Sequence, residues 1–152
     1  MAIIAYEMVY SKAHIERPQI ECLPFREGCF QEYMQIYNAC FYEMRKALDI
    51  KPYNYLSDYG QIREKREGIF LFMKANKIVG SVACLGNEID DLIVDKQYQG
   101  RGLGKQLLLW GMNHIRSHNE GTITLHVAAW NQKAVKLYED VGFEIANVEQ
   151  IH

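Results

Sequence analysis

The feature that most constrains this chain is a glycine-rich turn between an apolar strand pattern and an apolar helical pattern. Residues 88–94 read EIDDLIV, and the turn that follows contains Gly100, Gly102 and Gly104. Glycine inside a helix costs about 1 kcal/mol relative to alanine, so three glycines at a helix start need a reason. Glycine accepts positive φ angles and close approach of a ligand, and the free N–H groups of a first helical turn attract anions. The pattern therefore predicts a phosphate-binding turn.

The spacing of the turn excludes the two commonest phosphate-binding motifs. A P-loop requires GxxxxGK followed by Ser or Thr, whereas here Gly100 lies four residues before Gly104 and Gln106 follows Lys105. The dinucleotide fingerprint GxGxxG differs from the GxGxG found here. Arg101 and Lys105 add positive charge beside the turn. A simple glycine-rich connection from strand to helix stays open as the alternative.

Length and composition favour a single ordinary folded domain. The 152 residues suffice for a single core, and a net charge of -2 without a basic tract gives no argument for nucleic acid or an acidic membrane surface. The N-terminus lacks a basic leader and no apolar run could span a membrane, so we expect a cytoplasmic protein. The four cysteines show no metal-ligand spacing, and no metal is expected.

Hydrophobic periodicity predicts an α/β domain of the α+β type with a mixed sheet. Strands are expected at residues 3–10, 18–24, 69–74, 78–84, 88–94, 122–128 and 143–151. Helices are expected at residues 28–49, from the glycine turn to about residue 118, and from Asn131 to Gly142.

Two motifs carry a resemblance to a known family. The stretch QGRGLG at 99–104 resembles the Q/R-x-x-G-x-G/A loop of the GNAT (N-acetyltransferase) superfamily. The stretch LHVAAWNQKAVKLYEDVGF at 125–143 resembles the second signature of that family, in which an Asn begins a helix, a Tyr follows seven residues later and Gly-Phe closes it. The resemblance implies one domain over residues 1–152, with a mostly antiparallel sheet flanked by helices and splayed at its two middle strands, 88–94 and 122–128.

The resemblance also implies an activity and a cofactor. The activity would be transfer of an acetyl group from acetyl-CoA to a primary amine of a small molecule or peptide, by direct attack of the amine on the thioester. A non-catalytic acyl-CoA-binding or sensing module of the same fold is the alternative. The residues implied to bind the cofactor are Leu92, Ile93, Val94, Gln99, Gly100, Arg101, Gly102, Leu103, Gly104, Lys105, Asn131, Lys133 and Tyr138.

Candidates for proton transfer follow from the same comparison. Tyr138 matches the family tyrosine beside the sulfur, where its phenol could protonate the leaving thiolate. Glu88 lies eleven residues before Gln99, where the protein-lysine branch of the family keeps its general base, and Asp91 directly precedes the implied oxyanion residue. Strand alternation predicts Glu88 and Asp90 on one face of the strand and Asp91 on the other. The carboxylate that acts as base therefore stays open.

The acceptor side is predicted less sharply. Candidate substrate contacts are Tyr53, Tyr55, Tyr59, Asp90 and His126, in which aromatic rings and carboxylates would suit a cationic amine. The family runs a further strand after the Gly-Phe segment, and only nine residues follow Phe143 here. We expect part of the N-terminal extension, residues 1–14, to fill that edge with a strand at 3–10. The strand would come from the same subunit or from a partner in a homodimer.

Overall fold

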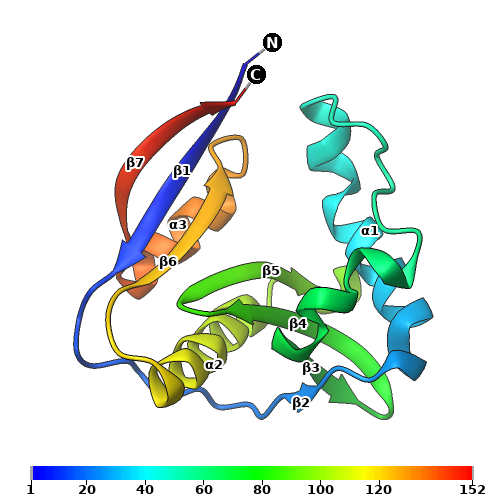
Figure 1. Ribbon diagram of the computed structural model, residues 1–152, viewed down its shortest axis with the longest axis horizontal. Coiled ribbons are helices and arrows are strands. Elements are labelled where there is room, and N and C mark those ends of the chain that lie inside the picture. Colours follow the sequence, from blue (N-terminus) through cyan, green and yellow to red (C-terminus); the bar gives the residue numbers. More distant parts are fainter. Residues whose placement is uncertain (1, 152) are drawn as a thin grey trace.

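A mixed seven-stranded sheet forms the centre of the protein, whose computed structural model describes residues 2–151 (Figure 1). From edge to edge the strands follow the order β2-β3-β4-β5-β6-β1-β7. Neighbouring strands are antiparallel except β5 and β6, which are parallel. The strands are β1 (Ile3–Tyr10), β2 (Leu23–Pro24), β3 (Ile69–Lys74), β4 (Lys77–Leu85), β5 (Glu88–Val94), β6 (Ile123–Ala128) and β7 (Glu144–Ile151). The predicted fold class is confirmed.

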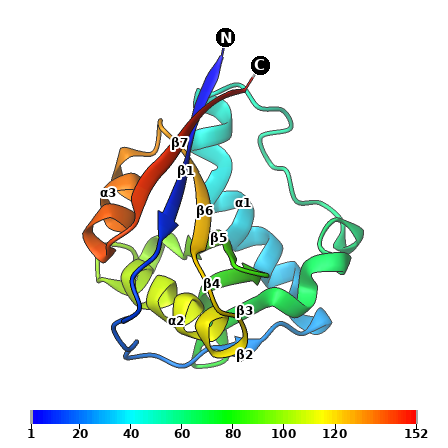
Figure 2. The same cartoon turned by 60° about the vertical axis from the view of Figure 1, so that its left-hand side comes forward.

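Helices cover both faces of this sheet. The chain forms α1 (Phe30–Ala47), α2 (Leu103–His118) and α3 (Gln132–Val141), with 3-10 segments η1 (Glu27–Cys29), η2 (Tyr59–Gln61), η3 (Arg63–Gly68) and η4 (Lys96–Tyr98). Helices α2 and α3 pack on one face and α1 packs on the other (Figure 2). Within residues 2–151, no helix combines the length and apolar character needed to cross a membrane.

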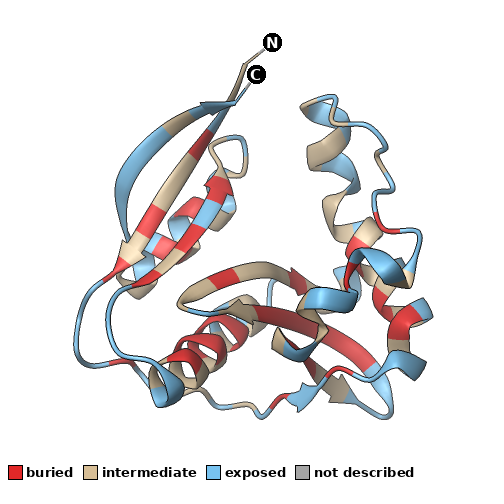
Figure 3. Ribbon diagram, in the orientation of Figure 1, coloured by how far each residue is buried: buried red, intermediate tan, exposed pale blue. Residues whose placement is uncertain are grey.

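Two apolar clusters, one on each face of the sheet, hold these layers together. The α2/α3 cluster includes Met8, Leu107, Leu108, Met112, Leu125, Tyr138 and Phe143. The α1 cluster includes Tyr33, Leu56, Ile62, Ile69, Leu71 and Ile93. Figure 3 shows the buried positions concentrated on α2, β3 and β4 and spaced along β1 and β6. Burial of this apolar surface is the main stabilising contribution to the fold.

The strand expected at 18–24 is largely wrong. Only Leu23–Pro24 pairs with β3, and residues 11–22 run along α2 instead. There side chains of α2 satisfy the extended backbone, because Asn113 Nδ2 donates to the carbonyl of Glu16 at 2.9 Å and the N–H of Gln19 donates to Gln106 Oε1 at 2.6 Å. Backbone groups satisfied by side chains need no strand ladder, so the apolar pattern of this stretch gave a misleading signal.

Strand β1 lies inside the sheet, between β6 and β7. Glu7 is opposite His126 of β6 on one side and Asn147 of β7 on the other. Its neighbour Met8 points to the opposite face and is fully buried in the α2/α3 cluster. A strand at residues 3–10 is confirmed and comes from the same chain, but it is inserted rather than at the edge. The outer edge is β7, which is almost entirely exposed (Figure 3).

The two middle strands part from each other soon after they begin. Pairing between β5 and β6 is confined to Glu88 with Thr124 and Ile89 with Leu125. Beyond these pairs β6 turns away towards β1, as Figure 1 shows, and within residues 2–151 the rest of β5 has no ladder partner on that side. The splay predicted between residues 88–94 and 122–128 is confirmed.

A β-bulge changes which way the residues of β5 point. Asp91 and Leu92 together face the single residue Val82 of β4, and Asp91 has a positive φ of 42°. An extra residue in a strand shifts the alternation by one position. Ile89 and Leu92 therefore both pack against the α2/α3 cluster, and Asp90 and Asp91 both point to the face of α1. The prediction that these two carboxylates lie on opposite faces is wrong.

Candidate active site

The glycine turn has the backbone geometry that glycine alone adopts without strain. Gly100 has a φ of 78° and Gly102 a φ of 80°, and a Cβ atom built on either would meet nothing within 4 Å. Gly104 differs, because its Cβ would lie 3.5 Å from Leu137 of α3. Gly100 and Gly102 thus shape a turn with open space above it, whereas Gly104 allows α2 and α3 to approach.

The N-terminus of α2 begins without a side-chain cap. Gly102 is the N-cap and provides no side-chain hydrogen bond to the first turn, so the N–H groups that begin α2 lack a capping acceptor. Arg101 lies beside the turn with its guanidinium 5.3 Å from the ring centroid of Tyr98. Lys105 pairs with Glu16 at 3.6 Å, and both side chains are well exposed. Open glycines, an uncapped helix start and two flanking cations are features that favour binding of an anion.

Gln99 fixes the turn to the strand before it. Its Nε2 atom donates to the carbonyl of Val94, the last residue of β5, at 3.0 Å. The backbone of Leu92, Ile93 and Val94 lies on the part of β5 that has parted from β6. An extended ligand could pair there as an added strand. The turn and the free strand edge are therefore continuous along the chain.

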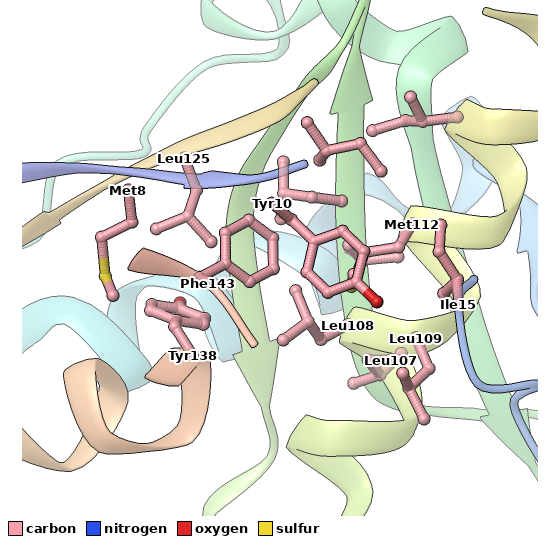
Figure 4. Packing of buried hydrophobic residues seen from close by; sticks show 14 of the residues in the cluster. Met8, Tyr10, Ile15, Leu107, Leu108, Leu109, Met112, Leu125, Tyr138 and Phe143 are labelled. Atoms are coloured by element: carbon pink, nitrogen blue, oxygen red, sulfur yellow. The ribbon is translucent and has the colours of Figure 1, made fainter. Parts of the chain in front are cut away.

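Tyr138 and Asn131 occupy the second motif. Asn131 caps α3, since its Oδ1 atom accepts from the N–H of Ala134 at 3.2 Å. Tyr138 is 9% exposed and packs near Phe143 and Met8 (Figure 4). Burial raises the pKa of Tyr138 to about 12, which keeps its phenol protonated at neutral pH. Lys133 is exposed on the first turn of α3.

Asp90 and Asp91 meet a lysine that the sequence did not single out. The Lys65 ammonium lies 2.8 Å from the carboxylate of Asp91 and 3.5 Å from that of Asp90. Asp91 is the more enclosed, with its side chain 14% exposed. Burial, and then the charge of Asp90, raise the pKa of Asp91 above its ordinary value, while Lys65 and the Tyr37 hydroxyl limit the rise. No local pattern identifies Lys65, because only the bulge in β5 turns both carboxylates towards it.

A second polar cluster surrounds His126. Its ring nitrogens lie 3.5 Å from Glu88, 3.6 Å from Glu7 and 3.6 Å from Glu149. These residues come from four strands, β5, β6, β1 and β7, and point to the face away from α3. Glu88 and His126 were predicted as site residues and do lie together. Glu7 and Glu149 were missed, because only the insertion of β1 between β6 and β7 brings them there.

The connector tyrosines do not converge on one point. The Tyr53 hydroxyl donates to Asp49 at 2.6 Å, and Tyr55 lies under the guanidinium of Arg45 at 4.4 Å. Tyr59 accepts a hydrogen bond from Arg66 at 2.6 Å. Each ring thus has a partner within the connector and its neighbouring helix.

Solved acetyltransferases share this fold. An acetyltransferase of the GNAT family from Colwellia psychrerythraea superposes with a TM-score of 0.74 at 16% identity, over 99% of this chain and 55% of that one. An N-acetyltransferase from Staphylococcus aureus Mu50 superposes with a TM-score of 0.59 at 14% identity, over 82% of this chain and 90% of that one.

The sequence comparison defines the family. Residues 30–143 match the model of the acetyltransferase (GNAT) family, and the chain belongs to that family. A mycothiol acetyltransferase from Corynebacterium glutamicum is 40% identical over 55 residues, which are 36% of this chain and 19% of the relative. An N-acetylaspartate synthetase from Xenopus tropicalis is 34% identical over 110 residues, covering 64% of this chain and 39% of the relative. The chain thus spans between about a fifth and two fifths of these curated relatives.

Proposed function

We propose that this protein is an acetyl-CoA-dependent N-acetyltransferase that acts on a primary amine of a small molecule or peptide. The observation that carries the proposal is the continuity of three features: the free edge of β5, the open glycine turn and the uncapped start of α2. Together they offer one extended run of backbone N–H and C=O groups that ends at an anion site. A ligand that joins an amide-containing arm to phosphates, as coenzyme A does, fits this run.

Specific residues would hold acetyl-CoA. Its phosphates fit the N–H groups of residues 100–104, beside Arg101 and Lys105, and its arm fits the backbone of Leu92, Ile93 and Val94. Gln99 would hold the turn against the end of β5. Asn131 and Lys133, at the start of α3, would line the other side of the site. Acetyl-CoA supplies the acetyl group as a thioester, and its transfer to an amine forms an amide bond as the carbon–sulfur bond breaks.

Two side chains are proposed to move protons. Asp91 would accept the proton that the acceptor ammonium must lose, because it is the most enclosed carboxylate of β5 and lies where β5 and β6 part. Tyr138 would give its proton to the departing thiolate, since its raised pKa keeps the phenol protonated. Glu88 is the second candidate for the base, but it lies at the paired end of the two strands and is 37% exposed.

Negative charge on the sheet face that α1 covers favours a cationic acceptor. The carboxylates there are Glu7, Glu88, Asp90, Asp91 and Glu149, and the cations in contact with them are Lys65 and, when protonated, His126. An ammonium group would be attracted to this surface and a free carboxylate repelled. We therefore propose an amine without a nearby negative charge as acceptor, although one relative bears the name N-acetylaspartate synthetase.

Thermal stability with and without acetyl-CoA tests the proposal first. A ligand that binds only the native state adds about 2.7 kcal/mol of stability at a hundred times its dissociation constant. We expect acetyl-CoA to raise the melting temperature, and ATP and NAD to leave it unchanged. A screen of alkylamines, diamines and short peptides, followed by release of free coenzyme A thiol, then tests turnover. Binding without turnover of any amine would favour the acyl-CoA-binding module, and no binding would refute both.

A further inference from the structure

Lys65 contacts both of the carboxylates, Asp90 and Asp91, that the bulge in β5 brings to one face. Lys65 belongs to η3, the segment that leads into β3, and its side chain is 28% exposed. Its ammonium is 2.8 Å from Asp91 and 3.5 Å from Asp90. Among residues 2–151, it is the only cation in ion-pair contact with either carboxylate.

We propose that Lys65 is a positioning residue for acetyl transfer, which holds the carboxylate of Asp91 ionised and fixed in place on the part of β5 that has parted from β6. The inference rests on the proposed function, because it assigns Lys65 a part in the proton transfer made by Asp91.

The surroundings of Asp91 explain why it needs a cation. Two neighbouring carboxylates on one face repel each other, and each favours protonation of the other. Asp90 supplies that repulsion from the same strand. From helix α1, Tyr37 hydrogen-bonds Asp91, and the nearby Tyr33 is fully buried with a hydroxyl that has no hydrogen-bond partner within residues 2–151. Lys65 is thus the cation that, together with the hydrogen bond from Tyr37, partly offsets the burial of Asp91 and the charge of Asp90.

The bulge makes the arrangement specific to this site. With regular alternation, Asp90 and Asp91 would lie on opposite faces, and one lysine could not contact both. The positive φ of Asp91 is a strained conformation for a residue with a side chain, and such strain persists only when the surroundings hold it. The ion pair between the Asp91 side chain and Lys65 is one contact that stabilises this backbone conformation.

Removing the charge of Lys65 has a defined effect on proton transfer. The pKa of Asp91 would rise further, so the carboxylate would be protonated over more of the range below neutral pH. Activity that needs ionised Asp91 would then fall at low pH and recover as the pH rises. An opposite charge at this distance lowers a carboxyl pKa by about 1 unit or more, so we expect the acid limb of kcat/KM to move up by about 1 pH unit.

The experiment compares Lys65→Met and Lys65→Arg with the unchanged protein, using whichever amine of the screen is turned over fastest. Arg63→Met is the matched control, because Arg63 is an exposed cation of the same segment that lies over the ring of Tyr59. We expect Lys65→Met to shift the acid limb upward, Lys65→Arg to restore it and Arg63→Met to leave it in place. Circular dichroism checks folding, and Lys65→Gln replaces Lys65→Met if the latter does not fold.

A second measurement does not depend on turnover. Carboxyl-labelled aspartate, with the Asp91 resonance assigned by its loss in Asp91→Asn, gives the pKa of Asp91 by NMR in each variant. An unchanged Asp91 titration and an unchanged acid limb in Lys65→Met would overturn the inference while the acetyltransferase proposal stands. Absence of turnover for every amine would instead refute the proposed function, and the role of Lys65 with it.

Discussion

Ile89 and Leu92 pack into the same apolar cluster although three positions separate them along one strand. This spacing is incompatible with regular alternation and follows from the bulge opposite Val82. Its consequence is chemical, because the two residues between them, Asp90 and Asp91, both turn towards α1. The carboxylate pair that we propose for proton transfer thus exists because β5 contains a bulge.

The choice of base can be tested by removing one carboxylate at a time. We expect Asp91→Asn to lower kcat by about 100-fold or more, the range typical of a lost general base, and to leave acetyl-CoA binding unchanged. Glu88→Gln should lower kcat much less, since Glu88 lies at the closed end of the splay. Steady-state kinetics with a thermal-shift assay for binding make the comparison. A larger loss in Glu88→Gln than in Asp91→Asn would transfer the role of base to Glu88.

Tyr138→Phe separates the proposed acid from a packing residue. The phenylalanine keeps the ring that packs against Phe143 and removes only the hydroxyl. We expect kcat to fall by about 10-fold to 100-fold, because the thiolate then leaves without a proton donor, while the melting temperature changes little. Stopped-flow release of coenzyme A and a melting curve provide the two readouts. An unchanged kcat would leave Tyr138 a core residue only.

Alanine should weaken the protein at Gly102, which lies in the glycine turn, but not at Gly28, which lies elsewhere in the chain. Gly102→Ala forces a side chain into a φ of 80°, which costs about 1 kcal/mol or more, and it places a methyl group in the open space where the phosphate is proposed to bind. Gly28→Ala is the control, because Gly28 in η1 has no positive φ and its Cβ would meet nothing within 4 Å. We expect weaker acetyl-CoA binding and a lower unfolding free energy only for Gly102→Ala, measured by calorimetry and urea titration. Equal effects at both positions would argue against a phosphate site in this turn.

Acceptor selectivity should depend on the cluster around His126. Glu149 lies 3.6 Å from the His126 ring and 37% exposed on β7, away from the proposed base. We expect Glu149→Gln to raise KM for a diamine by a few-fold and to change KM for the matching monoamine less, because only the diamine carries a second cation. Kinetics at low and high salt check this, since screening weakens exposed charge pairs. Identical changes for both amines would exclude a role of Glu149 in selecting a second cation.

The sequence by itself determined the order of elements and the glycine turn. The EIDDLIV strand, the turn at Gly100 and Gly102 and the Asn131 cap depend on local conformational preferences, and the structure confirms these elements with nearly the predicted bounds. The splay was implied by the family resemblance that the two motifs carry. Most of the strand expected at residues 18–24 is absent, and within it the N–H of Gln19 donates to the side chain of Gln106 on α2 rather than to a strand.

Tertiary structure alone decided which side chains meet. Glu7 and Glu149 reach His126 only because β1 inserts between β6 and β7, and Lys65 reaches Asp91 only because an extra residue in β5 shifts the alternation. The local pattern of a strand gives its period but neither its neighbours nor its bulges. Those depend on contacts between segments far apart in the chain, so the charges around the proposed site could be read only from the folded protein.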